Sequence, residues 1–198
     1  MIKVAFRMPG RYNYGLVKEH RYYKGKGRRK QMICENKAPV AVVMGSDSDM
    51  PTMQVCIDTL IDFGIKPQVR IISAHRTPAA AAEFAEKAGT SGIKVIIAAA
   101  GMAAHLAGAL AARTTLPVVA VPMISSGGLE GIDALVSTVQ MPAGVPVATM
   151  AIGKAGAKNA AILAVQILAL SDEKLGDKLA QFKRQLEQKT IEKDNTVQ

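Results

Sequence analysis

The chain alternates short apolar runs with amphipathic or alanine-rich stretches from Val40 onward. Five apolar runs lack the alternation of apolar and polar residues that is typical of a strand with one solvent-exposed face. They predict strands buried on both faces, at residues 40–44, 68–72, 95–100, 118–121 and 147–150. The intervening and following stretches predict helices at residues 50–63, 79–88, from 101–105 onward, 132–139, 158–170 and 173–193.

Strands separated by helices indicate a parallel sheet that is covered on both faces. Right-handed crossovers then give a three-layer α/β fold, most simply with the flavodoxin-like strand order 2-1-3-4-5. The apolar stretch Val95 to Ala112 is predicted to be a buried strand and a buried helix rather than a membrane span. His105 lies inside it, and Lys94 and Arg113 bracket it. We therefore expect no membrane partner.

Residues that favour the ends of helices and strands stand where these elements meet their loops. Asp49 is expected to be the N-cap of the first helix, and Gly64 to end that helix in the left-handed conformation. Thr77 is expected to cap the second helix, and Pro122 to close the fourth strand.

The formal net charge of +9 comes entirely from the first part of the chain. Residues 1–38 hold 11 of the 25 Lys and Arg but 2 of the 16 Asp and Glu, which leaves 14 charges of each sign afterwards. A neutral body does not support a nucleic-acid-binding face, so no nucleic-acid partner is expected. Residues 1–38 are interpreted as a basic, loosely ordered leader. It is either an upstream extension ahead of Met32 or an arm that binds acidic partners.

Two cysteines, Cys34 and Cys56, support neither a disulfide framework nor a metal site. A reducing, cytoplasmic location is therefore expected, with no metal. Residues 39–170 are predicted to form a single catalytic α/β domain.

Three polar loops follow the first three predicted strands, and in a parallel sheet such loops meet at one rim, where ligands bind. In the loop of residues 73–78, the imidazole of His75, a group that can both accept and donate a proton, stands beside the permanent cation of Arg76, and the hydroxyl of Ser73 precedes them. This combination suits proton transfer next to a phosphate. The loop is the strongest functional signal in the sequence.

The other two loops allow both a functional and a structural interpretation. Residues 45–49, Gly-Ser-Asp-Ser-Asp, form either a phosphate site or ordinary helix caps, and Asp47 or Asp49 would accept a hydrogen bond from a sugar hydroxyl. Gly101 permits close approach either of a ligand or of a packed helix. For His105 a structural or subunit-interface role is favoured over a catalytic one.

Four ordered segments resemble the class I N5-carboxyaminoimidazole ribonucleotide mutases of purine biosynthesis, the PurE family. They are residues 45–49, Ser-Ala-His-Arg-Thr-Pro at 73–78, Ala-Ala-His-Leu at 103–106 and Val-Gln-Met-Pro-Ala-Gly-Val-Pro-Val-Ala-Thr at 139–149. The resemblance extends from about Val40 to Leu170. The CO2-dependent class II carboxylases usually have Lys-Gly where this chain has Arg76-Thr77, which favours the mutase.

The resemblance implies that an isomerase without cofactor or metal moves a carboxylate from N5 to C4 of the substrate. It implies that Ser46, Asp49 and Arg76 bind the ribose phosphate with Ser73 nearby. His75 would be the general acid and base, and CO2 would be trapped near Gly101.

The resemblance further implies a homo-octamer with sites between subunits, in which the helix of residues 171–198 packs on a neighbouring subunit. The chain departs from the family pattern in its basic leader, at Met102, where glycine is usual, and at Ala107, where proline is usual. The alternatives are a CO2-dependent carboxylase on the same fold and a non-enzymatic flavodoxin-like binder of phosphate ligands. A signalling receiver is a poor fit because no aspartate ends the third strand, and a flavin site because no Trp is present.

Overall fold

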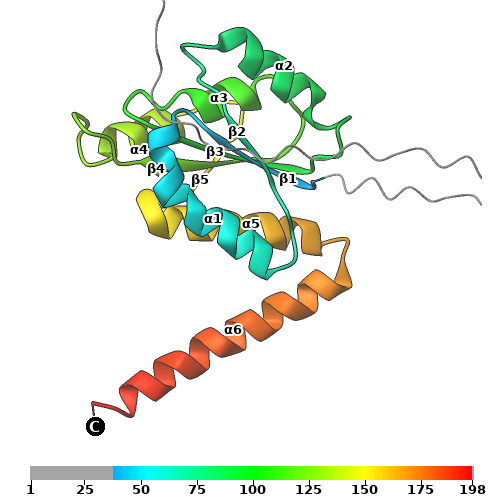
Figure 1. Ribbon diagram of the computed structural model, residues 1–198, viewed down its shortest axis with the longest axis vertical. Helices are drawn as coiled ribbons and strands as arrows, with labels where there is room; N and C mark the ends of the chain where they lie inside the picture. The colour runs from blue at the N-terminus through cyan, green and yellow to red at the C-terminus, as the bar shows by residue number, and fades with distance from the viewer. Residues whose placement is uncertain (1–37, 198) are drawn as a thin grey trace, which may run out of the picture. The chain divides into compact units, whose positions relative to one another are not determined.

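The computed structural model describes residues 38–197 and contains a five-stranded parallel sheet (Figure 1). Its order, β2-β1-β3-β4-β5, confirms the predicted order. The strands are β1 (Val40–Met44), β2 (Gln68–Ile71), β3 (Val95–Gly101), β4 (Val118–Met123) and β5 (Ala148–Thr149). The prediction for the leader lies outside the described residues, apart from Ala38.

Helices connect successive strands and complete the three layers. They are a short 3-10 helix η1 (Asp47–Asp49), then α1 (Met50–Asp62), α2 (Pro78–Ala88), α3 (Leu106–Ala111), α4 (Ile132–Val139), α5 (Gly153–Ala169) and α6 (Glu173–Asp194). The stretch Val95 to Ala112 forms β3 and α3, as predicted. In the described part of the chain, no helix has the length and apolar character needed to cross a membrane.

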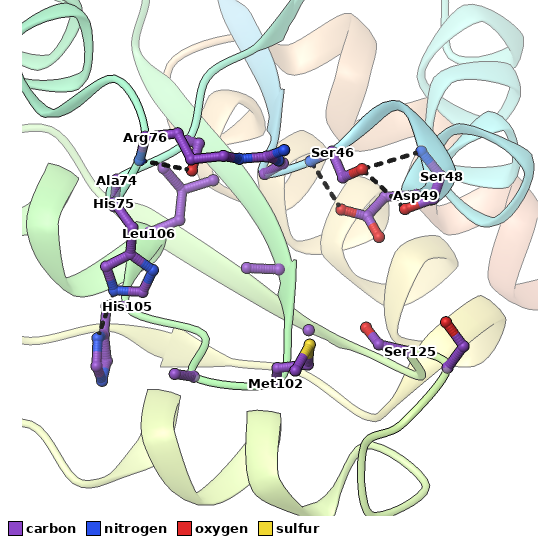
Figure 2. A pocket seen from close by; sticks show the side chains of 16 residues that line it. Ser46, Ser48, Asp49, Ala74, His75, Arg76, Met102, His105, Leu106 and Ser125 are labelled. Carbon is purple, nitrogen blue, oxygen red and sulfur yellow. Dashed lines mark hydrogen bonds between the residues drawn. The ribbon is translucent and has the colours of Figure 1, made fainter.

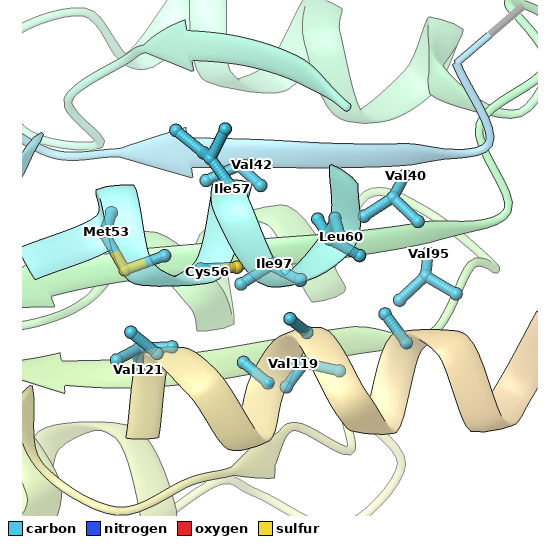
Figure 3. Close-up of a cluster of buried hydrophobic side chains, with 14 of the residues drawn as sticks. Val40, Val42, Met53, Cys56, Ile57, Leu60, Val95, Ile97, Val119 and Val121 are labelled. Carbon is cyan, nitrogen blue, oxygen red and sulfur yellow. The ribbon is translucent and has the colours of Figure 1, made fainter. Parts of the chain in front are cut away.

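The sheet separates two hydrophobic cores, because successive side chains of a strand point to opposite faces. In β1, Val40, Val42 and Met44 join α1 and α5, whereas Ala41 and Val43 join α2 and α3. Figure 3 shows the first core, with side chains of α1 packed on the strands. Cys56 is buried in this core, and burial raises the pKa of its thiol to about 12. Cys56 is therefore a packing residue and not a reactive thiol.

Helix α5 begins at Gly153, five residues before the predicted start at Lys158. Gly153 has a φ of +69°, and a Cβ on Gly156 would lie 1.6 Å from the carbonyl oxygen of Ala151. The two glycines thus permit a tight entry into the helix. From the sequence alone, two glycines so close together indicate a loop, because glycine is unfavourable in the interior of a helix.

Pro122 does not close the fourth strand, which continues to Met123. The Ala120 carbonyl accepts a bond from the N–H of Met150, so Ala120 faces β5. The backbone of Pro122, two residues later, faces the same side of β4. The last paired residue of β5 is Thr149, which lies beside Ala120, so β5 does not reach Pro122. Its missing N–H therefore costs no ladder hydrogen bond.

The first half of α6 packs on its own chain. The ring of Phe182 meets that of Phe63 edge to face with centroids 5.6 Å apart, and Lys178 donates a 2.8 Å hydrogen bond to the Phe63 carbonyl. The described side chains after Phe182 are exposed, among them Leu186 and Ile191. Figure 1 shows this half of the helix extending away from the sheet.

Candidate active site

A cavity of about 480 Å³ lies at the carboxyl ends of the strands. The register fixes its position, because Met44 of β1 is aligned with Ile71 of β2 and with Ala99 of β3. Strands β1 and β2 therefore end at the same level and β3 continues for two more residues, and the loops after all three strands meet at the cavity, as predicted. A fourth loop after β4 contributes Ser125 and Ser126, which the sequence analysis did not assign to the site.

The loop after β1 is organised by Ser46. Its hydroxyl accepts from the N–H of Ser48, and its own N–H donates to the Asp49 carboxylate, which forms a capping box around η1. Asp49 stands at the N-cap position of α1, as expected, but its side chain makes no capping bond there. The side-chain cap is made one turn earlier by Ser46, because the 3-10 turn η1 precedes the helix.

Asp49 is a buried acid at the edge of the cavity, with 5% of its surface exposed. Burial raises its pKa above the ordinary value because it disfavours the charged form. The hydrogen bond from the backbone of Ser46 opposes this effect, and the neighbouring charge of Asp47 adds to it. The carboxylate can still accept hydrogen bonds from a ligand.

Internal hydrogen bonds shape the loop after β2. The Thr77 hydroxyl accepts from the Ser73 N–H and donates to the Ser73 carbonyl, and the Ser73 hydroxyl accepts from the N–H of Arg76. Thr77 stands at the N-cap position of α2, yet its side chain makes no capping bond there, contrary to prediction. It closes the loop instead.

Arg76 links the first two loops, since its Nη2 donates a 3.0 Å hydrogen bond to the Gly45 carbonyl. A guanidinium has five N–H donors, so others remain available for a ligand. Figure 2 shows Arg76 reaching across the top of the cavity toward Ser46. The permanent cation therefore lies beside the serine-rich loop.

His75 and His105 form a pair, with Nε2 of His75 2.9 Å from Nδ1 of His105 (Figure 2). The rings meet edge to face, and one of the two nitrogens must carry the hydrogen. The sequence analysis placed His105 in a structural or interface role and missed this contact. The signal was present, because each histidine lies on a loop predicted to reach the same rim.

Gly101 and Met102 form the floor of the cavity at the end of β3. A Cβ on Gly101 would lie 1.8 Å from Oγ of Ser125, so the fourth loop occupies the place of a side chain. Met102 has a φ of +55°, a conformation that favours glycine. The described residues contain no cluster of His, Cys, Asp and Glu that could hold a metal ion.

Residues 39–189 match the family model described as AIR carboxylase. The chain belongs to the AIR carboxylase family. It is 51% identical over 158 residues to the N5-carboxyaminoimidazole ribonucleotide mutase of Bacillus subtilis, a match that covers 80% of this chain and 97% of that protein. It is also 51% identical over 149 residues to the enzyme of the same name from Escherichia coli K12, with 75% and 88% covered.

Solved structures agree with this assignment. The crystal structure of Treponema denticola PurE superimposes with a TM-score of 0.72 at 30% sequence identity. The match covers 80% of this chain and 98% of that one. Both the family and the fold indicated by the sequence segments are thereby confirmed.

Proposed function

We propose that this protein is an N5-carboxyaminoimidazole ribonucleotide mutase of purine biosynthesis. It moves the carboxylate of its substrate from N5 to C4 of the imidazole. Relatives about half identical over most of their length carry this name. The observation that carries the mechanism is the histidine pair at one side of a cavity whose other side presents a fixed cation and several hydroxyls.

The ribose phosphate binds at the end of the cavity formed by the first two loops. Arg76 supplies charge-assisted donors to the phosphate, and the hydroxyls of Ser46 and Ser73 add neutral ones. Asp49 is suited to a sugar hydroxyl, because a carboxylate accepts such a bond but repels a phosphate. The buried position of Asp49 fixes its orientation.

His75 is the general acid and base. In the first step the bond between N5 and the carboxylate carbon breaks, CO2 leaves without the bonding electrons, and N5 takes a proton from His75. In the second step C4 attacks CO2, and the proton on C4 passes to His75. The net reaction consumes no proton, so one positioned imidazole is sufficient.

His105 orients His75 through their 2.9 Å contact. A histidine ring held by a second group keeps one tautomer and one direction for its proton. Gly101 and its small neighbours Ala100 and Ala103 line the space in which CO2 resides between the two steps. CO2 is neutral, so this space needs no charged group and no cofactor or metal.

A CO2-dependent aminoimidazole ribonucleotide carboxylase is the second candidate, because the matching family model is described as AIR carboxylase. Two observations favour the mutase. The relatives that are about half identical are named mutases, and Arg76-Thr77 replaces the Lys-Gly usual in class II.

The enzyme acts as a cytoplasmic homo-octamer with sites between subunits. Support comes from helix α4, on which Ile132, Val136 and Val139 are each more than half exposed. Their spacing places them on one face of the helix. A contiguous apolar face of this kind is typical of a surface that another subunit covers. Light scattering at several protein concentrations tests the octamer.

The activity is tested by following freshly prepared N5-carboxyaminoimidazole ribonucleotide in buffer depleted of bicarbonate. We expect conversion to the C4-carboxylated isomer by the native enzyme and its loss in His75→Asn. Asp58→Asn, which also introduces asparagine but at an exposed position of α1 outside the cavity, is the control and should retain conversion. Conversion only of aminoimidazole ribonucleotide with CO2 would establish the carboxylase instead. An active His75→Asn would refute the proton shuttle.

A further inference from the structure

Met102 is an exposed sulfur-containing residue in the wall of the cavity. Its relative exposure is 53%, although a thioether side chain favours burial. The other sulfur-containing side chains between residues 38 and 197 are buried or half-buried: Met44, Met50, Met53, Cys56, Met123, Met141 and Met150. An oxidant in solution therefore reaches the sulfur of Met102 more easily than any other sulfur in this part of the chain.

The backbone holds this side chain at the cavity. Met102 has a φ of +55°, a conformation that costs free energy in an L-residue and persists only where the surrounding structure holds it. Ser125 supplies a holding contact, because it packs directly against the preceding residue, Gly101. Figure 2 shows Met102 across the cavity from Arg76, with its sulfur turned into the cavity. A chemical change at this sulfur is therefore presented to whatever the cavity binds.

We propose that Met102 is a site of reversible oxidation that lowers the activity of the enzyme, an inference that rests on the proposed function. The oxidant is a peroxide such as hydrogen peroxide. A lone pair of the Met102 sulfur attacks one peroxide oxygen and the O–O bond breaks, so the thioether is oxidised to the sulfoxide and the peroxide is reduced to water. An opening that admits a ribonucleotide to the cavity also admits this much smaller molecule.

Oxidation changes the chemistry of the cavity wall. The apolar sulfur becomes a polar group whose oxygen accepts hydrogen bonds and cannot donate one. With the phosphate at Arg76, the carboxylate of the substrate lies toward the other end of the cavity, which His105 and Met102 line. An ionised carboxylate is also an acceptor only, so it is repelled by the sulfoxide oxygen. Oxidation of Met102 therefore weakens the binding of the substrate.

The test combines a peroxide titration with mass spectrometry. The full-length enzyme is treated with increasing hydrogen peroxide, its conversion of N5-carboxyaminoimidazole ribonucleotide is measured, and the sulfoxide at each methionine is quantified in peptides. A portion is then treated with both types of methionine sulfoxide reductase, because each type reduces one epimer of the sulfoxide. Met102→Leu removes the sulfur, and Met141→Leu, at a half-buried methionine outside the cavity, is the matched control. The activity of each variant is expressed relative to its own untreated sample.

We expect the activity of the native enzyme to fall several-fold in step with the sulfoxide at Met102, with a larger rise in KM than fall in kcat. The reductases should restore this activity. Met102→Leu should keep its activity at peroxide doses that inactivate both the native enzyme and Met141→Leu. Full activity of enzyme oxidised at Met102, or equal inactivation of Met102→Leu, would overturn the proposal. Absence of conversion by the untreated native enzyme would instead refute the proposed function on which the proposal rests.

Discussion

Substituting Gly101 by alanine tests how closely the fourth loop packs on the end of β3. The new Cβ would lie 1.8 Å from Oγ of Ser125, and 3.1 Å both from Cβ of Ser125 and from the carbonyl oxygen of Met123. Rotation of the Ser125 hydroxyl removes the first clash. The other two contacts require the loop or the strand end to shift by a few tenths of an ångström.

The expected cost follows from these contacts. Overpacking of this kind costs about 1–3 kcal/mol. The unfolded chain of the alanine variant has less conformational entropy, which offsets about 0.4–1 kcal/mol where the native φ suits alanine. Gly101 is not among the glycines with positive φ, so the offset applies. We therefore expect Gly101→Ala to lower the free energy of unfolding by about 1–2 kcal/mol.

Urea denaturation at a fixed protein concentration measures this loss, because assembly makes stability concentration-dependent. Gly45→Ala is the matched control, since its Cβ would make only ordinary contacts at 3.7 Å, and it should be neutral or slightly stabilising. A double-mutant cycle with Ser125→Gly should recover about 1 kcal/mol of the loss, because it removes two of the three contacts. Additive effects in that cycle would refute the packing argument.

Two further changes test other parts of the structure. Asp49→Asn should raise stability near neutral pH relative to the native enzyme, an advantage that vanishes in acid. Because the pKa of Asp49 is raised in the folded state, the folded protein holds this proton more tightly than the unfolded chain does. The free energy of unfolding of the native enzyme therefore falls as the pH rises from the pKa of Asp49 in the unfolded chain through its pKa in the folded protein. Urea titrations at several pH values measure the difference, and an advantage that grows in acid would contradict it. Phe182→Ala should cost about 1–3 kcal/mol by removing the ring contact with Phe63, whereas Leu186→Ala, farther along the exposed half of α6, should cost little. An equal loss of unfolding free energy at Leu186 would show that another chain covers that half of the helix.

The fold was predictable wherever one local pattern decided the structure. Strand β1 and helix α4 have the predicted bounds, because an uninterrupted apolar run and a helical stripe each end at residues that break the pattern. The strand order followed from general rules for right-handed crossovers. The convergence of the first three loops followed in turn from that order.

Features that depend on contacts between distant residues were not predictable in this way. The strand continues through Pro122 only because β5 has already ended beside it. The glycines of α5 enter a helix only because Ala151 closely approaches Gly156. Ser125 gave no signal of its own, since its contact is with the backbone of Gly101 on another strand.

The distance between the two histidines is set by the scaffold and not by the histidines themselves. The loop of His75 is closed by hydrogen bonds between Ser73 and Thr77, which involve neither imidazole. The backbone of His105 is fixed separately, because its carbonyl accepts from Ala109 in the first turn of α3. A pair positioned from two independent anchors needs little reorganisation when a proton moves, which is the property that general acid–base catalysis requires. It also follows that loss of one imidazole leaves the backbone of the other in place and removes only the contact between the rings.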